Sequence, residues 1–366
     1  DPVHYGHLAV IEKAARLCDK LYVALGVNPE KAGKHLFSED ERVRLVKNAV
    51  GTLSLEAEVE VGTFHGLLAQ YALSKGADFI ARSVRDAKDT DYELLLAEFN
   101  SGYGLDTVIL PLSGVDGKIK NASSSMLKLL AGDGCLVHDY TAPMAKQALE
   151  EKIRKVSIIG VTGLMGSGKS TFCRQLCEYA SAQGVSVTHV DCDAVAHSMY
   201  SSSSEYYPAV RNAIVSEFGE EVCEGNSINR KALAKKALLT NESRLRLMKV
   251  LEAPFRAKIE GIIAGTKGVL LLDAAYLDMM LPWVNYNVLL VKCDEDERKK
   301  RVFARGHMDD EAYARLSSYL LAPDAFREKL QQEQARHRHG LLYEIDSGKA
   351  DYKEALEWIQ TNFPMF

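Results

Sequence analysis

The sequence predicts an α/β protein whose two domains are each built on a doubly wound parallel sheet. Its length of 366 residues suits about two domains. Strand-like apolar runs alternate with helix-like segments from the N-terminus, and this alternation starts again at residue 156. A glycine-rich motif stands between a strand pattern and a helix pattern at that restart. Such alternation favours parallel sheets that bind their ligands at the carboxyl ends of the strands.

The composition indicates a globular protein in a reducing compartment. Hydrophobic residues make up 47% of the chain and charged residues 26%, and a net charge of −5 argues against broad binding of nucleic acids or membrane surfaces. Seven cysteines are scattered without a C-x-x-C pair. The longest apolar stretch, from Val269, is interrupted by Asp273 and Asp278, so we expect no membrane span. We expect a cytoplasmic protein, and the start at Asp1 leaves a preceding targeting segment open.

In the first half, the patterns predict alternating helices and strands. Ser38 to Glu41 form a capping box, which marks the start of a helix that continues to Val50. Strands are expected at residues 21–27, 59–61, 78–81 and 107–110, and the other helices at 7–18, 67–74 and 89–99. We expect a first domain over residues 1–150, joined by a helix to a second domain over residues 155–366.

Polar residues gather where the predicted strands and helices of the first half meet. His4-Tyr5-Gly6-His7 is an H-x-G-H motif directly before a helix. Imidazole groups at this position can donate hydrogen bonds to phosphate oxygens as charge develops in an in-line displacement. Taken alone, the motif is equally compatible with a surface turn that carries incidental histidines.

Further motifs of the first half favour a phosphate-binding site over a surface turn. Asn28-Pro29-Glu30-Lys31 and Arg82-Ser83-Val84-Arg85 each follow a predicted strand, and Ala122-Ser123-Ser124-Ser125 opens a later helix. Together with H-x-G-H, these segments resemble the phosphopantetheine adenylyltransferase family across residues 1–150. The resemblance implies a nucleotidyltransferase with a Rossmann-like fold.

The resemblance also implies roles for individual residues. His7 stabilises the transition state at the α-phosphate, Lys31 helps to hold substrate and triphosphate oxygens, and Arg82 binds the phosphate of pantetheine or the transferring group. The implied ATP-binding residues are His4, Arg85, Glu93, Ser123, Ser124 and Ser125.

This half departs from the family in two places. Ser83 stands where the family usually has glycine, and the family's first strand with its Gly-Thr-Phe end is not in the sequence. Because that strand is central in the family's sheet, we expect a truncated record and weak adenylyltransferase activity from this chain. The sequence of residues 1–7 also resembles that of nicotinate-mononucleotide adenylyltransferases. The segments at 28–31 and 82–100, in contrast, favour pantetheine phosphate as the acceptor.

The second half opens on a phosphate-binding motif. Residues 163–170 match G-x-x-x-x-G-K-[ST] at every fixed position, between a strand pattern at 156–161 and a helix pattern. Backbone N–H groups and the helix N-terminus then bind phosphates, Lys169 bridges the β- and γ-phosphates, and Ser170 ligates Mg²⁺. The other residues expected at ATP are Gly163, Gly166, Ser167, Gly168 and Thr171. This spacing and context disfavour an ordinary glycine-rich turn.

Carboxylates and arginines follow the next strand patterns. Asp191 and Asp193 end a strand at 185–190, so one carboxylate can hold Mg²⁺ through water and the other can take a hydroxyl proton; an acidic helix cap is the alternative. We expect Asp191 at the metal. A helical stretch at 205–266 precedes a buried strand that ends at Asp273, like a Walker-B strand in pattern. Arg301 and Arg305 then suit a lid that closes over phosphates, or a solvated helix face.

In order and type, these motifs resemble dephospho-CoA kinase from residue 155 to the C-terminus. The resemblance implies that Asp193 is the base for a ribose 3′-hydroxyl, and that Arg301 and Arg305 neutralise the transferring phosphates. Ala253 before Pro254, where bacterial members often carry histidine, and Tyr319, where the family usually has glutamine, depart from the pattern.

The two resemblances concern consecutive reactions and so support each other. They imply a bifunctional coenzyme A synthase, which uses ATP and Mg²⁺ to convert 4′-phosphopantetheine to dephospho-CoA and then to CoA. One alternative is a nicotinate-mononucleotide adenylyltransferase fused to another small-molecule kinase. A second is an ATP-binding regulator with an inactive first domain. The sequence does not indicate an oligomeric state.

Overall fold

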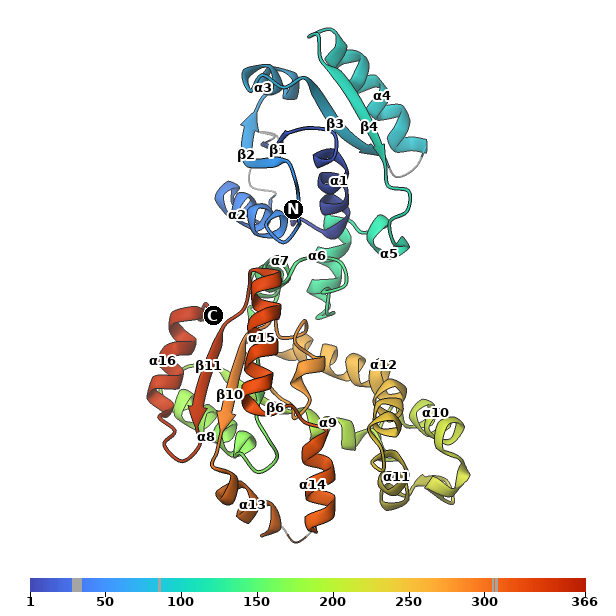
Figure 1. Cartoon of the computed structure of the whole chain (residues 1–366), viewed down its shortest axis with the longest axis vertical. Coiled ribbons are helices and arrows are strands. Elements are labelled where there is room, and N and C mark those ends of the chain that lie inside the picture. Colours follow the sequence, from blue (N-terminus) through green and yellow to red (C-terminus); the bar gives the residue numbers. More distant parts are fainter. Residues whose placement is uncertain (28–34, 85–86, 305, 307–308) are drawn as a thin grey trace. The chain divides into compact units, whose positions relative to one another are not determined.

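The chain folds into two compact units (Figure 1). The computed structural model describes the 366 residues apart from 28–34, 85–86, 305 and 307–308. The first unit comprises residues 1–132, 136–153 and 335–339, and the second comprises residues 133–135, 154–334 and 340–366.

Helices and parallel strands alternate in the first unit. Its elements are α1 (Tyr5–Ala15), β1 (Lys20–Val27), α2 (Glu39–Val50), β2 (Glu58–His65), α3 (Leu68–Ser74), β3 (Phe79–Val84), α4 (Ala87–Ser101), β4 (Asp106–Pro111), α5 (Gly117–Lys120), α6 (Ser124–Gly132), α7 (Pro143–Leu149) and the π-helical turn η2 (Glu150–Arg154). The predicted alternation is confirmed, and Ser38 and Glu41 form the expected capping box. Strand β2 is longer than predicted because its pairing with β1 continues to the pair formed by Val27 and His65.

The strands of the first unit form two parallel pairs. β1 pairs with β2, and β3 pairs with β4. Among the residues that the structure describes, no strand hydrogen-bonds β1 to β3. A cavity of about 1010 Å³ is lined by residues of β1, β3 and α1. The sheet of this unit is therefore divided, with the cavity bordered by one strand of each pair.

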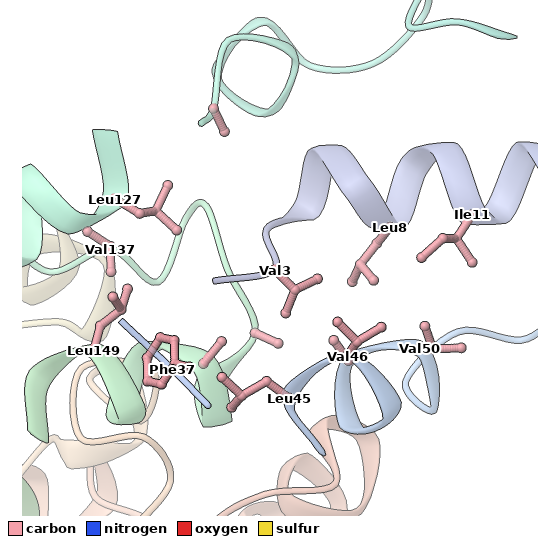
Figure 2. Packing of buried hydrophobic residues seen from close by; sticks show 14 of the residues in the cluster. Val3, Leu8, Ile11, Phe37, Leu45, Val46, Val50, Leu127, Val137 and Leu149 are labelled. Atoms are coloured by element: carbon pink, nitrogen blue, oxygen red, sulfur yellow. The ribbon is translucent and has the colours of Figure 1, made fainter. Parts of the chain in front are cut away.

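The core of the first unit lies between its helices and the β1–β2 pair. Helices α1 and α2 direct apolar side chains toward each other, and α6 and the segment around α7 add more (Figure 2). The buried residues labelled there are Val3, Leu8, Ile11, Phe37, Leu45, Val46, Val50, Leu127, Val137 and Leu149. This packing holds the start of α1, and with it the H-x-G-H segment, against the rest of the unit.

The second unit contains a continuous sheet and a separate helical region. Its elements are β5 (Val156–Thr162), α8 (Lys169–Ala182), β6 (Val187–Asp191), α9 (Cys192–Ser198), α10 (Tyr207–Phe218), η3 (Glu220–Val222), β7 (Cys223–Glu224), β8 (Ser227–Ile228), α11 (Arg230–Ala237), α12 (Asn241–Gly265), β9 (Gly268–Asp273), η4 (Leu277–Met279), β10 (Val288–Lys292), α13 (Glu295–Phe303), α14 (Asp310–Ser318), α15 (Pro323–His337, whose last residues belong to the first unit), β11 (Leu342–Asp346) and α16 (Tyr352–Asn362).

Five parallel strands form this sheet in the order β11-β10-β5-β9-β6. All residues of β5 and β9 are buried, as expected for central strands of a parallel sheet. Apolar residues of α8 and α16 pack on one face of the sheet (Figure 1). The carboxyl ends of β5, β6 and β9 lie side by side, so the segments that follow them meet at one edge.

The stretch predicted as largely helical also contains a short hairpin. Strands β7 and β8 pair antiparallel within it, and their neighbours pack with α10, α11 and α12 around a small core of their own. Pro254 lies inside α12. None of the helices described here combines the length and the apolar character that crossing a membrane requires.

Candidate active sites

The phosphate-binding loop joins β5 to α8 in a conformation that needs glycine. Gly166 and Gly168 have φ angles of 84° and 94°, in the left-handed region. A Cβ atom on Gly163 would lie 2.2 Å from the carbonyl oxygen of Val291. Ser167 is buried and donates its backbone N–H to Leu164 at 3.0 Å, which closes the turn. The loop therefore presents its backbone at the N-terminus of α8, where a phosphate binds.

The motif's lysine and serine are already engaged by neighbouring oxygens. Lys169 Nζ donates to the carbonyl oxygen of Gly163 at 3.1 Å, and Ser170 Oγ donates to Asp273 Oδ2 at 2.6 Å. Asp273 is 3% exposed at the end of β9. Thr171, the residue after the motif, is exposed and accepts a hydrogen bond from Arg174 at 3.5 Å. The pair of Ser170 and Asp273 thus places hard oxygen ligands beside the loop, which suits Mg²⁺.

The two aspartates after β6 differ in their surroundings. Asp191 Oδ1 accepts the backbone N–H of Ala194 at 2.9 Å and so caps α9. The pKa of Asp193 is raised, mainly because surrounding protein reduces its hydration; Asp191 and Asp273 add to the rise, and Lys169 opposes it. The side chain is still exposed, so water screens part of these effects. Asp193 thus has Lys169 and Asp273 as electrostatic neighbours.

Arginines of α13 approach the loop from its other side. The Nη1 atom of Arg301 would lie 3.2 Å from a Cβ atom on Gly168, and it donates to Ser347 Oγ at 3.1 Å. Arg298 is buried and donates to the carbonyl oxygen of Met165 at 3.2 Å. Arg305 lies outside the described residues. A guanidinium group therefore borders the phosphate-binding loop.

An arginine–aromatic cluster lies near Asp193. The guanidinium of Arg244 is 4.3 Å from the ring centre of Tyr276 and 5.7 Å from that of Tyr319. Burial raises the pKa of Tyr276; the charge of Arg244 lowers it, and that of Asp193 raises it further. Because Asp193 acts on Tyr276 electrostatically, this cluster belongs to the same site.

In the first unit, the two histidines of the H-x-G-H motif cap α1. His4 Nδ1 accepts the backbone N–H of Gly6 at 3.1 Å, and His7 Nδ1 accepts that of His4 at 3.2 Å. The two ring centres are 3.8 Å apart. Because each Nδ1 accepts, a neutral ring carries its proton on Nε2, which can then donate to a phosphate oxygen. A Cβ atom on Gly6 would lie 2.9 Å from the His4 ring, which explains the glycine between the histidines.

His7, Arg82 and Glu93 line the same cavity of about 1010 Å³. The guanidinium of Arg82 donates two hydrogen bonds to the carboxylate of Glu93, both at 2.7 Å. This bidentate contact raises the pKa of Arg82. Arg82 and Glu93 were expected to bind different parts of the substrates, and the structure brings them together as an ion pair.

The serines of the predicted ATP-binding turn hold the start of α6. Ser123 Oγ accepts the backbone N–H of Met126 at 3.2 Å, and Ser124 Oγ donates to the carbonyl oxygen of Pro2 at 2.8 Å. Ser125 is exposed. Ser124 thereby ties α6 to the segment that carries the H-x-G-H motif. Lys31 and Arg85 lie outside the described residues.

Comparison with known proteins covers both units. Residues 1–128 match the family model described as cytidylyltransferase-like, and residues 157–328 match that of dephospho-CoA kinase. Phosphopantetheine adenylyltransferases of Cutibacterium acnes, Bradyrhizobium diazoefficiens and Deinococcus radiodurans are 39%, 35% and 32% identical to this chain; the alignments span 42%, 42% and 43% of it and 92%, 92% and 90% of those proteins. The chain belongs to the phosphopantetheine adenylyltransferase family. It carries the kinase-like region in addition.

Solved structures show a weaker likeness. A dephospho-CoA kinase from Campylobacter jejuni is 18% identical with a TM-score of 0.32, and the match covers 57% of this chain and 97% of that one. The membership of the adenylyltransferase family rests on the identities of the curated relatives.

Several residues of the kinase-like site escaped the sequence analysis. It recognised the strand that ends at Asp273 but gave this carboxylate no place at the metal. It also gave Arg244, Tyr276 and Arg298 no role. For Asp273 a usable signal existed, because an acid directly after a buried apolar strand ends at the edge where phosphate-binding loops lie. Arg244 and Tyr276 lie in elements without such a signal.

Proposed function

We propose that this chain catalyses the last two steps of coenzyme A biosynthesis. ATP adenylylates 4′-phosphopantetheine to dephospho-CoA with release of pyrophosphate, and a second ATP phosphorylates the ribose 3′-hydroxyl of dephospho-CoA. The observation that carries the proposal is one chain with both an H-x-G-H helix cap and a phosphate-binding loop bordered by a carboxylate base. The family membership of the first unit and the dephospho-CoA kinase match of the second support it.

In the adenylyl transfer, the histidines act as hydrogen-bond donors. The phosphate of 4′-phosphopantetheine attacks the α-phosphorus of ATP, so the nucleophile needs no general base. Negative charge grows on the α-phosphate oxygens, and Nε2–H of His7 stabilises it. The cap bond from the His4 N–H to His7 Nδ1 orients this ring before the substrate binds. Arg82 binds the acceptor phosphate, for which it exchanges part of its contact with Glu93.

In the phosphoryl transfer, Asp193 takes the proton of the 3′-hydroxyl as that oxygen attacks the γ-phosphorus. Lys169 and Arg301 stabilise the charge of the transferring phosphoryl group. Lys169 leaves the carbonyl oxygen of Gly163 to reach it. The cluster of Arg244 and Tyr276 binds the acceptor nucleotide, because a cation and an aromatic face suit its phosphates and its adenine.

Mg²⁺ fits the kinase-like site. The Ser170 hydroxyl and the Asp273 carboxylate supply oxygen atoms only, which are the ligands that this hard cation prefers. When bound, the ion neutralises charge on the β- and γ-phosphates. Asp191 was proposed as a water-mediated ligand; its bond to the Ala194 N–H leaves its second oxygen for that contact.

We also propose a cytoplasmic location. The seven cysteines are scattered along the sequence without a C-x-x-C pair, which is typical of proteins in a reducing compartment. Fluorescence microscopy of the tagged protein in its native cells tests this, and an organellar signal would contradict it.

The test of the function is an assay of the purified chain with ATP, Mg²⁺ and either 4′-phosphopantetheine or dephospho-CoA. CoA should form from both acceptors. Lys169→Ala should convert 4′-phosphopantetheine to dephospho-CoA and stop there. His7→Ala should lose product from 4′-phosphopantetheine but still make CoA from dephospho-CoA. CoA from neither acceptor would overturn the proposal, and nicotinate mononucleotide in parallel tests the alternative acceptor.

A further inference from the structure

A second group of metal-binding side chains lies directly behind the phosphate-binding loop. Cys173 of α8, His189 of β6 and Asp273 of β9 each place one ligand atom within 4.8 Å of the others. Cys173 is 0% exposed, and His189 and Asp273 are largely buried. Three separate elements therefore bring a sulfur, a nitrogen and an oxygen together in the second unit.

The contacts of His189 indicate that this group is incomplete without a cation. Its Nε2 atom is buried and makes no hydrogen bond, although it lies 3.4 Å from Asp273 Oδ2. In the tautomer that carries its proton on Nδ1, Nε2 turns a lone pair toward the carboxylate oxygen, which is unfavourable, whereas a cation between the two atoms satisfies both. A buried imidazole nitrogen aimed at a carboxylate is thus an independent sign of a ligand.

The chemistry of the three atoms selects the type of cation. Mg²⁺ prefers oxygen ligands in an octahedral arrangement, whereas thiolate, imidazole and carboxylate together suit Zn²⁺ in a tetrahedral one. The alternative, a nucleophilic cysteine activated by histidine, does not fit, because burial raises the pKa of the Cys173 thiol well above its usual range. A metal can still bind there by displacing the thiol proton.

We propose that Cys173, His189 and Asp273 form an inhibitory Zn²⁺ site. Binding forms a metal–sulfur bond and releases the thiol proton to solvent, and water completes the tetrahedral shell. Zn²⁺ then competes with Ser170 for Asp273 Oδ2, the oxygen that accepts the Ser170 hydroxyl at 2.6 Å. The inhibition rests on the proposed kinase function, whereas the binding of the metal does not.

The consequence is a kinase step that stops when free Zn²⁺ rises. Altering a partner that orients a metal ligand typically lowers activity by roughly 10- to 100-fold. We expect a drop of that size in CoA formation from dephospho-CoA at saturating Zn²⁺ and constant Mg²⁺. A zinc-selective chelator should restore the rate, because the metal displaces a hydrogen bond and no covalent change occurs.

Direct metal binding provides the first test. Co²⁺ added to the full chain should produce the absorption of a cobalt–thiolate bond, and Zn²⁺ should abolish this absorption by competition. Cys173→Ser should remove the absorption and weaken Zn²⁺ binding by more than the roughly 10- to 100-fold expected for a lost outer partner. His189→Asn should weaken binding as well. It is a second variant on a different element, in case the buried substitution in α8 harms folding.

Cys177 provides a matched control. It lies one turn after Cys173 on the same helix and is not one of the three ligands. Cys177→Ser should keep both the cobalt–thiolate absorption and the inhibition by Zn²⁺. Absence of the absorption in the wild type, or its persistence in Cys173→Ser, would overturn the site. Metal binding without inhibition would overturn the regulatory part, whereas loss of kinase activity with Mg²⁺ alone would concern only the proposed function.

Discussion

At the scale of the residue, two side chains of the proposed active sites are each oriented by one specific contact. His7 is oriented by the His4 N–H, and Ser170 is directed at Asp273 by a hydrogen bond of 2.6 Å. Both contacts set the direction of a polar group before the substrate arrives. Preorganisation of this kind avoids reorganisation during the reaction.

Asp193 leads to a prediction about pH. A general base acts only when it is deprotonated. Because the pKa of Asp193 is raised, activity should be lost at a higher pH during acidification than with an ordinary aspartate. We expect kcat/KM of the kinase step to decline as the pH falls, at pH values above those at which an ordinary aspartate takes up its proton. Asp193→Asn should lower kcat by roughly 10²- to 10⁴-fold and remove this decline. A pH profile with dephospho-CoA as acceptor checks both, and an unchanged profile in the variant would show that another group is titrating.

His339 leads to a prediction about stability. Its Nε2 lies 2.8 Å from Gln147 Oε1 in the first unit, and burial lowers its pKa from 6.5 to about 4. Below pH 6.5, His339 binds a proton in the unfolded chain but stays neutral in the folded chain. The stability of the fold therefore falls with the pH until the pH reaches about 4, the pKa of His339 in the folded chain.

The loss between pH 7.5 and pH 5 should be about 2 kcal/mol. Urea unfolding of the wild type and of His339→Gln at both pH values measures it. The loss should be smaller by this amount in the variant, and equal losses would contradict the assignment.

At the scale of the element, a buried ion pair connects α7 with the first residue of η2. Lys146 Nζ lies 2.6 Å from Glu150 Oε1, with both side chains almost completely buried. Lys146→Met leaves the carboxylate buried without this partner, which should cost about 3–5 kcal/mol. Urea unfolding measures the change, and the additional substitution Glu150→Gln should recover part of the loss.

The exposed pair of Glu12 and Arg16 on α1 is the matched control, because it has the same spacing along a helix. Its side chains are 47% and 71% exposed. Arg16→Met should therefore change the free energy of unfolding by no more than about 1 kcal/mol. Similar effects of the two substitutions would show that burial of the Lys146 pair is unimportant.

At the scale of the whole molecule, the two units differ in the continuity of their sheets. Strand β5 of the second unit is paired on both sides and fully buried, whereas the first unit has two strand pairs beside a cavity of about 1010 Å³. We infer that the two units unfold independently, because each has a hydrophobic core of its own.

Calorimetry should accordingly resolve two unfolding transitions, one of which belongs to the first unit. Lys146→Met should lower only that transition. 4′-Phosphopantetheine should raise only the same transition, because a ligand stabilises the unit to which it binds. A single transition that both changes shift would contradict this independence.

The local features of both sites could be predicted from the sequence. The capping box at Ser38, the H-x-G-H cap and the loop at residues 163–170 depend on neighbours within a few positions, so spacing along the chain specifies them. The alternation of helices and strands was predictable for the same reason. The sequence patterns did not predict the ends of β2, because its pairing with another strand decides its length.

The sequence by itself determined the two nucleotide-binding motifs, because each is a short stretch of neighbouring residues. It also determined the α/β class, because helices and strands have different hydrophobic periodicities. Only the tertiary structure decided which distant side chains meet: Ser170 with Asp273, 103 positions later, and Cys173 with His189. Such contacts depend on the order and register of strands in the sheet. Strand β9 lies beside β5, although β6 comes before β9 in the chain. This order of strands in the sheet brings Asp273 next to the phosphate-binding loop.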